Sequence, residues 1–182
     1  YALAEVPVEL VEAQVFPEIN DLGSGIVFAS QELPHPQELT VITRDLVSPE
    51  LATDILVFDW WLHNEDRHLT ERGGNPNLLW DMQAGGLVVI DHNQAFDPDF
   101  NTENFLASHV FADHWNQVFS DYVEQERYRA KLVAALAKLP DIRVNIPDSW
   151  WFVDEGVPAN VTWDEIVACL ERCHRKDFWD TQ

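Results

Sequence analysis

Hydrophobic positions between residues 49 and 62 follow the spacing of an α-helix. One face carries four large apolar side chains at helical intervals: Leu51, Ile55, Phe58 and Leu62. Much of the remaining surface is apolar as well, with Ala52, Leu56, Trp60 and Trp61. A helix that is apolar on nearly all sides is buried. Ser48 is a suitable N-cap and Pro49 suits the first helical position, so we expect a buried helix that begins at residue 49.

Shorter apolar stretches predict strands before this helix. Residues 8–16 alternate imperfectly between apolar and polar positions, and residues 26–30 are largely apolar, so both are expected to be strands. The segment Gly23-Ser24-Gly25 predicts a turn between them. Residues 31–40 contain two prolines and are expected to form a connecting loop.

A β-hairpin is predicted after the helix. Residues 77–80 and 87–90 are short apolar strands, and the segment between them contains paired glycines that suit a hairpin turn. An antiparallel pair brings Asn77, at the start of the first strand, close to Asp91, just after the second.

The second half of the chain has mainly helical patterns. Helical segments are expected over residues 105–111, 122–139 and 147–153, and from Thr162 onward. Asp121 can cap the second of these, and Pro140 is expected to stop it. Thr162 and Glu165 form a capping box for the last one. Because the strands are few and early, the predicted fold class is α+β with helices dominant.

The composition is that of a folded and acidic protein. Eleven Lys and Arg residues against 32 Asp and Glu residues give a net charge of −21, and 46% of the residues are hydrophobic. Repulsion disfavours sequence-independent binding to nucleic acid or anionic lipid, so neither nucleic acid nor a membrane is expected as a direct partner. No apolar run reaches the length of a membrane span, and neither a membrane-spanning helix nor a signal peptide is expected.

The two cysteines, Cys169 and Cys173, are separated by one helical turn. A bridge across one turn fits disulfide geometry poorly, so reduced thiols in a cytoplasmic protein are expected. Together with His174 they could contribute to a metal site. Plain packing is favoured, because no fourth ligand is evident.

Polar and chargeable residues gather between the predicted helix and the end of the predicted hairpin. They are Asn64, Asp66, Arg67, His68, Asn77 and Asp91. Loops held by rigid supports commonly carry chemistry. In the predicted arrangement, the side-chain oxygens of Asp66, Asn77 and Asp91 converge on one small volume.

Two aspartates and an asparagine suit phosphoryl transfer. Oxygen ligands bind Mg²⁺, which usually shares its coordination shell with substrate phosphates. One acid takes or orients the hydroxyl proton, while the amide and the other acid hold the metal on the phosphates. Arg67 and Arg72 could offset negative charge on the transferred group. Pairing with some of the many carboxylates explains these two arginines equally well.

The sequence motif NEDRH…NPNLLW…LVVIDHNQAF resembles that of the HipA-like kinases of bacteria, a family with a protein-kinase-like fold. The resemblance implies that Asp66 is the catalytic base, that Asn77 is one metal ligand and that Asp91 is the main one. Arg67 and His68 follow the base in the motif and are expected in the catalytic segment. ATP and Mg²⁺ are the implied cofactors, and the implied activity is serine/threonine phosphorylation of a protein substrate.

The resemblance, which is clearest over residues 51–96, also predicts a division of the chain. Residues 1–47 correspond to the end of a nucleotide-binding lobe and a linker. Residues 48–182 correspond to a helical catalytic lobe, a protein-kinase-like C-lobe in which a short β-hairpin carries the metal site.

Such kinases hold the nucleotide phosphates with a Gly-rich loop and a lysine on an upstream strand. The first lysine here is Lys131, and no convincing Gly-rich loop is present. These parts are expected upstream in a longer protein or in a partner chain, or they are absent. An antitoxin-like protein is the other partner that the resemblance suggests.

The loop between Asp66 and Asn77 is longer than the family's usual loop, with residues 70–74 apparently inserted. Asn75 therefore competes with Asn77 for the role of metal ligand. Asn77 is preferred because it adjoins the apolar strand.

Three alternatives remain open. The first is a two-metal hydrolase site built from His63, Asp66, His68, Asp91 and His92, because His and Asp together suit Zn²⁺, Mn²⁺ or Fe. The second assigns Asp66, Asn77 and Asp91 to ordinary caps and turns. The third is a kinase-like protein that does not catalyse and serves as a binding or regulatory module, which the missing lysine supports.

Overall fold

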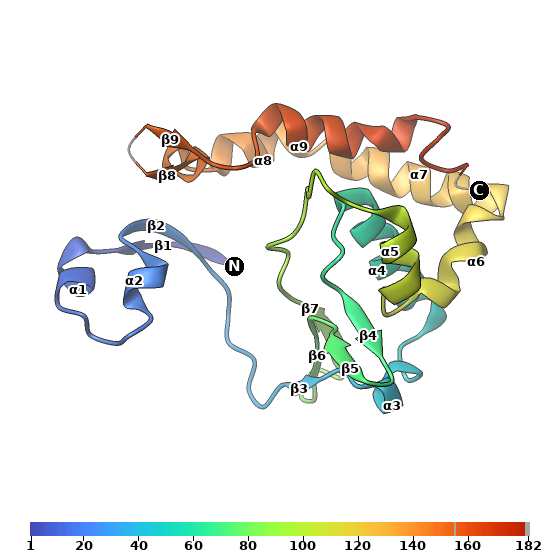
Figure 1. Cartoon of the computed structure of the whole chain (residues 1–182), viewed down its shortest axis with the longest axis horizontal. Helices are drawn as coiled ribbons and strands as arrows, with labels where there is room; N and C mark the ends of the chain where they lie inside the picture. The colour runs from blue at the N-terminus through green and yellow to red at the C-terminus, as the bar shows by residue number, and fades with distance from the viewer. Residues whose placement is uncertain (155, 181–182) are drawn as a thin grey trace. The chain divides into compact units, whose positions relative to one another are not determined.

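The computed structural model describes residues 1–154 and 156–180. The chain forms two compact units, Tyr1–His35 and Pro36–Gln182 (Figure 1). Residues 36–47, which the sequence grouped with the first part, lie in the second unit because β3 (Gln37–Glu38) pairs with β6 (Leu78–Asp81). The assignment of the first part to a nucleotide-binding lobe stays a prediction.

The first unit is an antiparallel strand pair with two short helices inserted. β1 (Ala2–Val6) pairs with β2 (Gly25–Ala29), and α1 (Val8–Glu12) and α2 (Ile19–Leu22) lie between them in sequence. The strand expected near residues 26–30 is confirmed. The turn before it is confirmed as well, since Gly23 ends α2 with a φ of 69°.

The strand predicted over residues 8–16 is wrong, because residues 8–12 are helical. Pro7 has an extended backbone and occupies the N-cap position of α1. The sequence that follows, VELVE, places Val8 and Val11 three residues apart, a spacing that suits one face of a helix as well as an irregular strand. The helical pattern is the one that the chain adopts.

Small antiparallel sheets and many helices make up the second unit. β3, β6 and β7 (Gly86–Val89) form a three-stranded sheet, while β4 (His68–Thr70) pairs with β5 (Gly73–Asn75). β8 (Phe152–Asp154) pairs with β9 (Val157–Pro158). The expected α+β class is confirmed, and the segment that the sequence suggested as an insertion is largely a hairpin of its own, β4–β5.

The helix expected from residue 49 is confirmed as α4 (Pro49–Leu62). Ser48 accepts a hydrogen bond from the Leu51 amide, and Pro49 occupies the first turn. The helix is buried along most of its length, and it contacts α6 (Trp115–Phe119) and α9 (Trp163–Leu170). In Figure 1, α4 and α5 (Thr102–Ser108) lie between the β4–β5 and β6–β7 hairpins and the layer of α7 and α9.

Aromatic rings fill the core around α4. Trp60 makes an edge-to-face contact with Trp115 at 5.1 Å between ring centroids, and its Nε1–H donates to the carbonyl of Phe178. Trp61 donates to the carbonyl of Leu170 over 2.7 Å. These two bonds join α4 to the C-terminal segment and satisfy indole N–H groups that burial would otherwise leave unpaired.

The remaining helical elements in the described part of the second unit are α3 (Val41–Arg44), η1 (Ala112–His114), α7 (Tyr122–Leu136), α8 (Leu139–Asn145), η2 (Asp148–Trp151) and η3 (Glu171–His174). Asp121 caps α7 and Thr162 caps α9 with a capping box, as expected. The expectation that Pro140 stops α7 is wrong. The helix already ends at Leu136, and Pro140 lies in the first turn of α8, where a missing N–H costs nothing.

The two cysteines are free thiols, as expected. They do not share one α-helix, because Cys173 lies on η3 while Cys169 lies on α9. Burial raises the pKa of both thiols. None of the helices in residues 1–154 and 156–180 has both the length and the apolar character needed to cross a membrane.

His63 ends α4 in the left-handed conformation, with a φ of 55°, and its ring stacks on Phe100 at 4.3 Å. Burial, together with the charge of Arg172, lowers the pKa of His63 to about 4.

The low pKa of His63 predicts a pH-dependent stability. Between pH 6.5 and about 4 the unfolded chain binds a proton at this position and the folded chain does not, so stability is complete above pH 6.5 and falls toward pH 4. His63→Asn removes this titration, and Asn tolerates the left-handed backbone. We expect the midpoint of thermal unfolding to fall less steeply between pH 7 and 4 in the variant than in the wild type. Equal slopes would contradict the prediction.

Candidate active site

The loop after α4 is fixed to the helix by a buried asparagine. The Asn64 amide nitrogen Nδ2 donates to Oδ1 of Asp59 over 2.9 Å, and the Asn64 backbone N–H donates to the Asp59 carbonyl over 3.0 Å. Its side-chain oxygen accepts the N–H of Asp66. Both Asn64 and Asp59 are completely buried. The rigid helix therefore determines where the backbone of Asp66 lies.

Two amide groups converge on the carboxylate of Asp66. Nδ2 of Asn77 lies 3.0 Å from Oδ2 of Asp66, and Nδ2 of Asn75 lies 3.1 Å from the same oxygen. Asn77 also donates to the backbone carbonyl of Asp66. The two asparagines that competed in the sequence thus both contact the expected base. Because Nδ2 of Asn77 faces Asp66, the carbonyl oxygen of that amide is directed elsewhere.

The β6–β7 hairpin is confirmed, and it places Asn77 and Asp91 at the same end. Leu78 pairs with Val89, and the N–H of Ile90 donates to the Asn77 carbonyl over 3.0 Å. Asn77 and Asp91 both have left-handed backbones, with φ values of 49° and 51°. Asn and Asp are the non-glycine residues that adopt this conformation most readily. Asp91 is exposed, and its Oδ1 accepts the N–H of Asn93.

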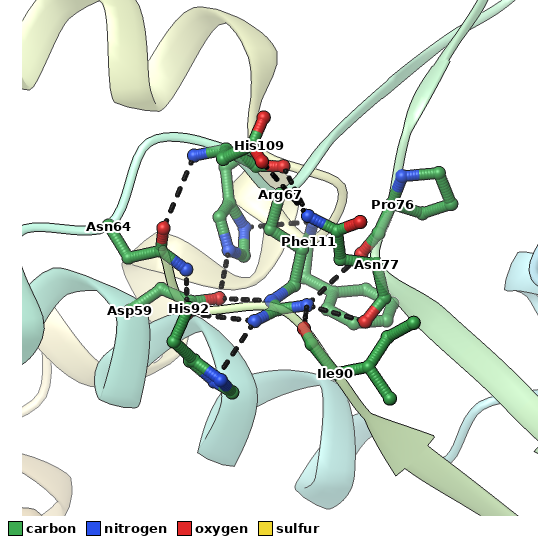
Figure 2. Close-up of polar contacts among 10 residues, drawn as sticks. Asp59, Asn64, Arg67, Pro76, Asn77, Ile90, His92, His109 and Phe111 are labelled. Carbon is green, nitrogen blue, oxygen red and sulfur yellow. Dashed lines mark hydrogen bonds and ion pairs between the residues drawn. The ribbon is translucent and has the colours of Figure 1, made fainter. Parts of the chain in front are cut away.

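Arg67 lies inside the protein, with a side chain that is 0% exposed. Its Nε donates to Oδ2 of Asp59 over 2.7 Å, and its Nη1 lies 2.7 Å from the carbonyl oxygen of Asn77. The carbonyls of Pro76 and Ile90 lie 3.2 and 3.3 Å from the same nitrogen. Figure 2 shows the guanidinium at the centre of these contacts. The geometry does not support the suggestion that Arg67 offsets charge on a transferred group, because its donors face buried partners.

A buried histidine completes the environment of Asp59. Nε2 of His109 lies 3.0 Å from Oδ2 of Asp59, and Nδ1 of His109 accepts the N–H of Phe111. The ring is therefore neutral, with its proton on Nε2. Burial lowers the pKa of His109, in agreement with that state. Burial alone would raise the pKa of Asp59, but the bond from His109 and the charge of Arg67 outweigh it and hold this pKa below its ordinary value.

Three further histidines, His63, His68 and His92, lie close to the candidate site in sequence. Nε2 of His92 lies 3.2 Å from Nη2 of Arg67 and accepts from it, and burial followed by the charge of Arg67 lowers the pKa of His92. His68 lies on β4, where its backbone pairs with Asn75 and with His109. His63 stacks on Phe100 and His92 accepts from Arg67, so these two histidines of the hydrolase alternative have separate partners.

The oxygen atoms at the open end of the hairpin suit Mg²⁺ better than a metal that prefers histidine. In residues 1–154 and 156–180 no three His, Cys, Asp or Glu side chains gather as a metal site. The amide oxygen of Asn77 and the exposed carboxylate of Asp91 are hard ligands of the kind that Mg²⁺ shares with water and phosphate oxygens. Arg72 lies apart from them, exposed at the turn of the β4–β5 hairpin.

Sequence reasoning missed Asp59 and His109. Asp59 had a signal, since it is a carboxylate in a helix that is otherwise apolar on nearly all sides. A buried carboxylate requires partners, and Arg67 is the cation nearest to it in sequence. His109 had no comparable signal, because an isolated histidine between apolar residues does not identify its partner.

Comparisons with known proteins identify a family for the whole chain. The family described as HipA-like kinase has a model that matches residues 1–182. No curated protein and no solved structure matches.

Replacement by alanine is expected to affect stability very differently at Gly74 on β5 and at Gly86 on β7. A Cβ on Gly74 would lie 2.4 Å from the carbonyl oxygen of His68 and 2.9 Å from Cα of Leu69, whereas a Cβ on Gly86 would have open space. We expect Gly74→Ala to destabilise the fold by about 1–3 kcal/mol, because backbone atoms must move to admit the methyl group. The matched control Gly86→Ala should be close to neutral. Chemical denaturation measures both, and a tolerated Gly74→Ala would show that the hairpin is held differently.

Proposed function

Because this chain belongs to the HipA-like kinase family, we propose that its kinase-like function is the transfer of phosphate from ATP to serine or threonine of a protein, with Mg²⁺ as the metal. The second unit would act as a protein-kinase-like catalytic lobe, and the β6–β7 hairpin would carry the metal site. The observation on which this depends is the contact between Asp66 and Asn77 beside the hairpin end that bears Asp91.

Asp66 is the proposed catalytic base. Asn75 and Asn77 both bind Oδ2, so the carboxylate is held in one orientation before a substrate arrives. A base that is already oriented avoids the entropy of ordering it during the reaction. In phosphoryl transfer this group accepts or orients the proton of the attacking hydroxyl.

Asn77 and Asp91 are the proposed ligands of Mg²⁺. The first would contribute its amide oxygen and the second its carboxylate. When bound, Mg²⁺ neutralises charge on the nucleotide phosphates. The chain contributes two ligands whose backbones are held at one end of a hairpin. Both residues have a left-handed backbone at the point where the hairpin strands meet the adjoining loops.

A second candidate function is a kinase-like module that binds without catalysing. One observation favours it. Lys131, the first lysine of the sequence, lies on α7 and pairs with Asp54 at 2.8 Å, so it does not take the place of a phosphate-binding lysine. Under the catalytic proposal, the groups that hold the nucleotide phosphates come from an upstream segment or from a partner chain.

Asp66→Asn tests the proposed base. It keeps the shape and most of the hydrogen bonds but removes the proton acceptor, so phosphate transfer should fall by about 10²–10⁴-fold while ATP binding is retained. The assay follows γ-phosphate transfer by intact mass and phosphoresidue mapping, in the longest natural product of the gene that contains these residues.

The matched control is Asp81→Asn, at the opposite end of the same hairpin. Asp81 accepts the N–H groups of Gln83 and Ala84 in the turn, and an asparagine can do the same. This variant should transfer phosphate as the wild type does. Full activity of Asp66→Asn would reject the assignment of the base. Binding of ATP without transfer by the wild type would favour the non-catalytic module.

Asp91→Asn tests the metal site separately. Loss of one negative ligand should raise the Mg²⁺ concentration required for half-maximal nucleotide binding by about tenfold or more, because Mg²⁺ prefers charged oxygen ligands. Titration of Mg²⁺ at fixed ATP, followed by calorimetry, measures the shift. An unchanged Mg²⁺ requirement would remove Asp91 from the proposed site.

A further inference from the structure

Arg67 follows the proposed base directly in the chain, and its buried guanidinium contacts the two segments that carry the proposed metal ligands. We propose that Arg67 is a positioning residue that sets the distance between the base and the metal ligands, acting through the backbone of the site and not on the phosphate. The inference rests on the proposed function, and it assigns to Arg67 a role different from direct catalysis.

The first connection runs to the base. Arg67 follows Asp66 directly in the chain, so fixing its side chain fixes the peptide that bears the carboxylate. The backbone carbonyl of Arg67 also accepts the N–H of Val110 over 3.0 Å, which ties this peptide to the segment after α5. The side chain is then anchored to α4 through Asp59, with both partners 0% exposed.

The second connection runs to the metal ligands. Nη1 lies 2.7 Å from the carbonyl oxygen of Asn77 and 3.3 Å from that of Ile90, the residue before Asp91. Nη2 lies 3.2 Å from His92, the residue after Asp91. One planar group thus contacts the peptide of Asn77 and both neighbours of Asp91 (Figure 2).

Stability alone is a weak explanation for this arrangement. Removing a charge pair from water is costly, and a buried pair often stabilises a protein no more than well-packed apolar residues of the same volume. The guanidinium has several hydrogen-bond donors in one rigid plane, and an apolar side chain has none. Those donors reach the carbonyls of Asn77 and Ile90, which are the backbone groups that determine where the ligands lie.

The test is Arg67→Lys compared with Arg44→Lys. Lysine keeps the charge opposite Asp59, but a compact ammonium cannot reach Asp59 and both hairpin carbonyls together. We expect phosphate transfer per folded molecule to fall by about 10- to 100-fold, since a displacement of about 1 Å suffices for such a loss. The Mg²⁺ requirement should rise as well, and the amide of Ile90 should exchange its hydrogen faster.

Arg44 is the matched control because it makes the same kinds of contact but bonds to neither Asp59 nor the hairpin that carries Asn77 and Asp91. Its Nε donates to the carbonyl of Val110, and its guanidinium pairs with Asp113. Arg44→Lys should change stability without changing the Mg²⁺ requirement or the exchange at Ile90. A merely structural role for Arg67 would make the two variants alike once activity is corrected for the folded fraction, and that result would overturn the proposal.

A second variant guards against failure of Arg67→Lys to fold. Asp59→Asn combined with Arg67→Met removes both charges, so neither is left buried without its partner. We expect this double variant to fold, to retain nucleotide binding and to lose transfer to the same extent. Wild-type transfer in the folded double variant would reject the positioning role.

The two proposals fail in distinguishable ways. If the wild-type protein transfers no phosphate, the proposed function is wrong, and faster exchange at Ile90 in Arg67→Lys would still support the link between α4 and the hairpin. If the wild type transfers phosphate and Arg67→Lys changes neither transfer nor exchange, the positioning role is wrong and the proposed function stands.

Discussion

The burial of one charge pair, Asp59 with Arg67, is the constraint on which the arrangement of the second unit depends. Neither group can be removed from water without full compensation. Asp59 accepts from Asn64, Arg67 and His109, and Arg67 donates to carbonyls of the hairpin. These requirements bring together a helix, a loop, a hairpin and the segment after α5.

Each segment contributes a different kind of rigidity. α4 is held on several sides by aromatic rings and by the indole bonds of Trp60 and Trp61, so it serves as the fixed reference. The hairpin is held by its ladder, by its pairing with β3 and by the contacts of Arg67 with the carbonyls of Asn77 and Ile90. The loop between them is irregular but is not loosely held, because Asn64 and Arg67 are both completely buried. The exposed carboxylate of Asp91 lies just after β7, outside this buried network.

Local sequence signals predicted much of the fold. The cap at Ser48, the capping box at Thr162 and the glycine turn of the β6–β7 hairpin each satisfy their own backbone groups, so a short window contains the needed information. The helix α1 was missed because Val8–Glu12 fits two periodicities and neighbouring segments decide between them. The direction of the Arg67 side chain was left open for a related reason. A guanidinium that faces a phosphate and one that faces a buried carboxylate are identical in sequence, and only the position of Asp59 on α4 separates them.

The β4–β5 hairpin has a consequence for how the sequence of this protein can vary. Asp66 and Asn77 are 11 positions apart in sequence, yet their side chains lie 3.0 Å from each other. Because the ends of the intervening chain are joined by strand pairing and by the bonds of Asn75 and Asn77 to Asp66, its length is decoupled from the geometry at its base. Each doubling of a loop costs only about 0.6 kcal/mol in closure entropy. Mutation or insertion at the tip of this hairpin can therefore change which molecules the protein contacts while the contact between Asp66 and Asn77 is kept.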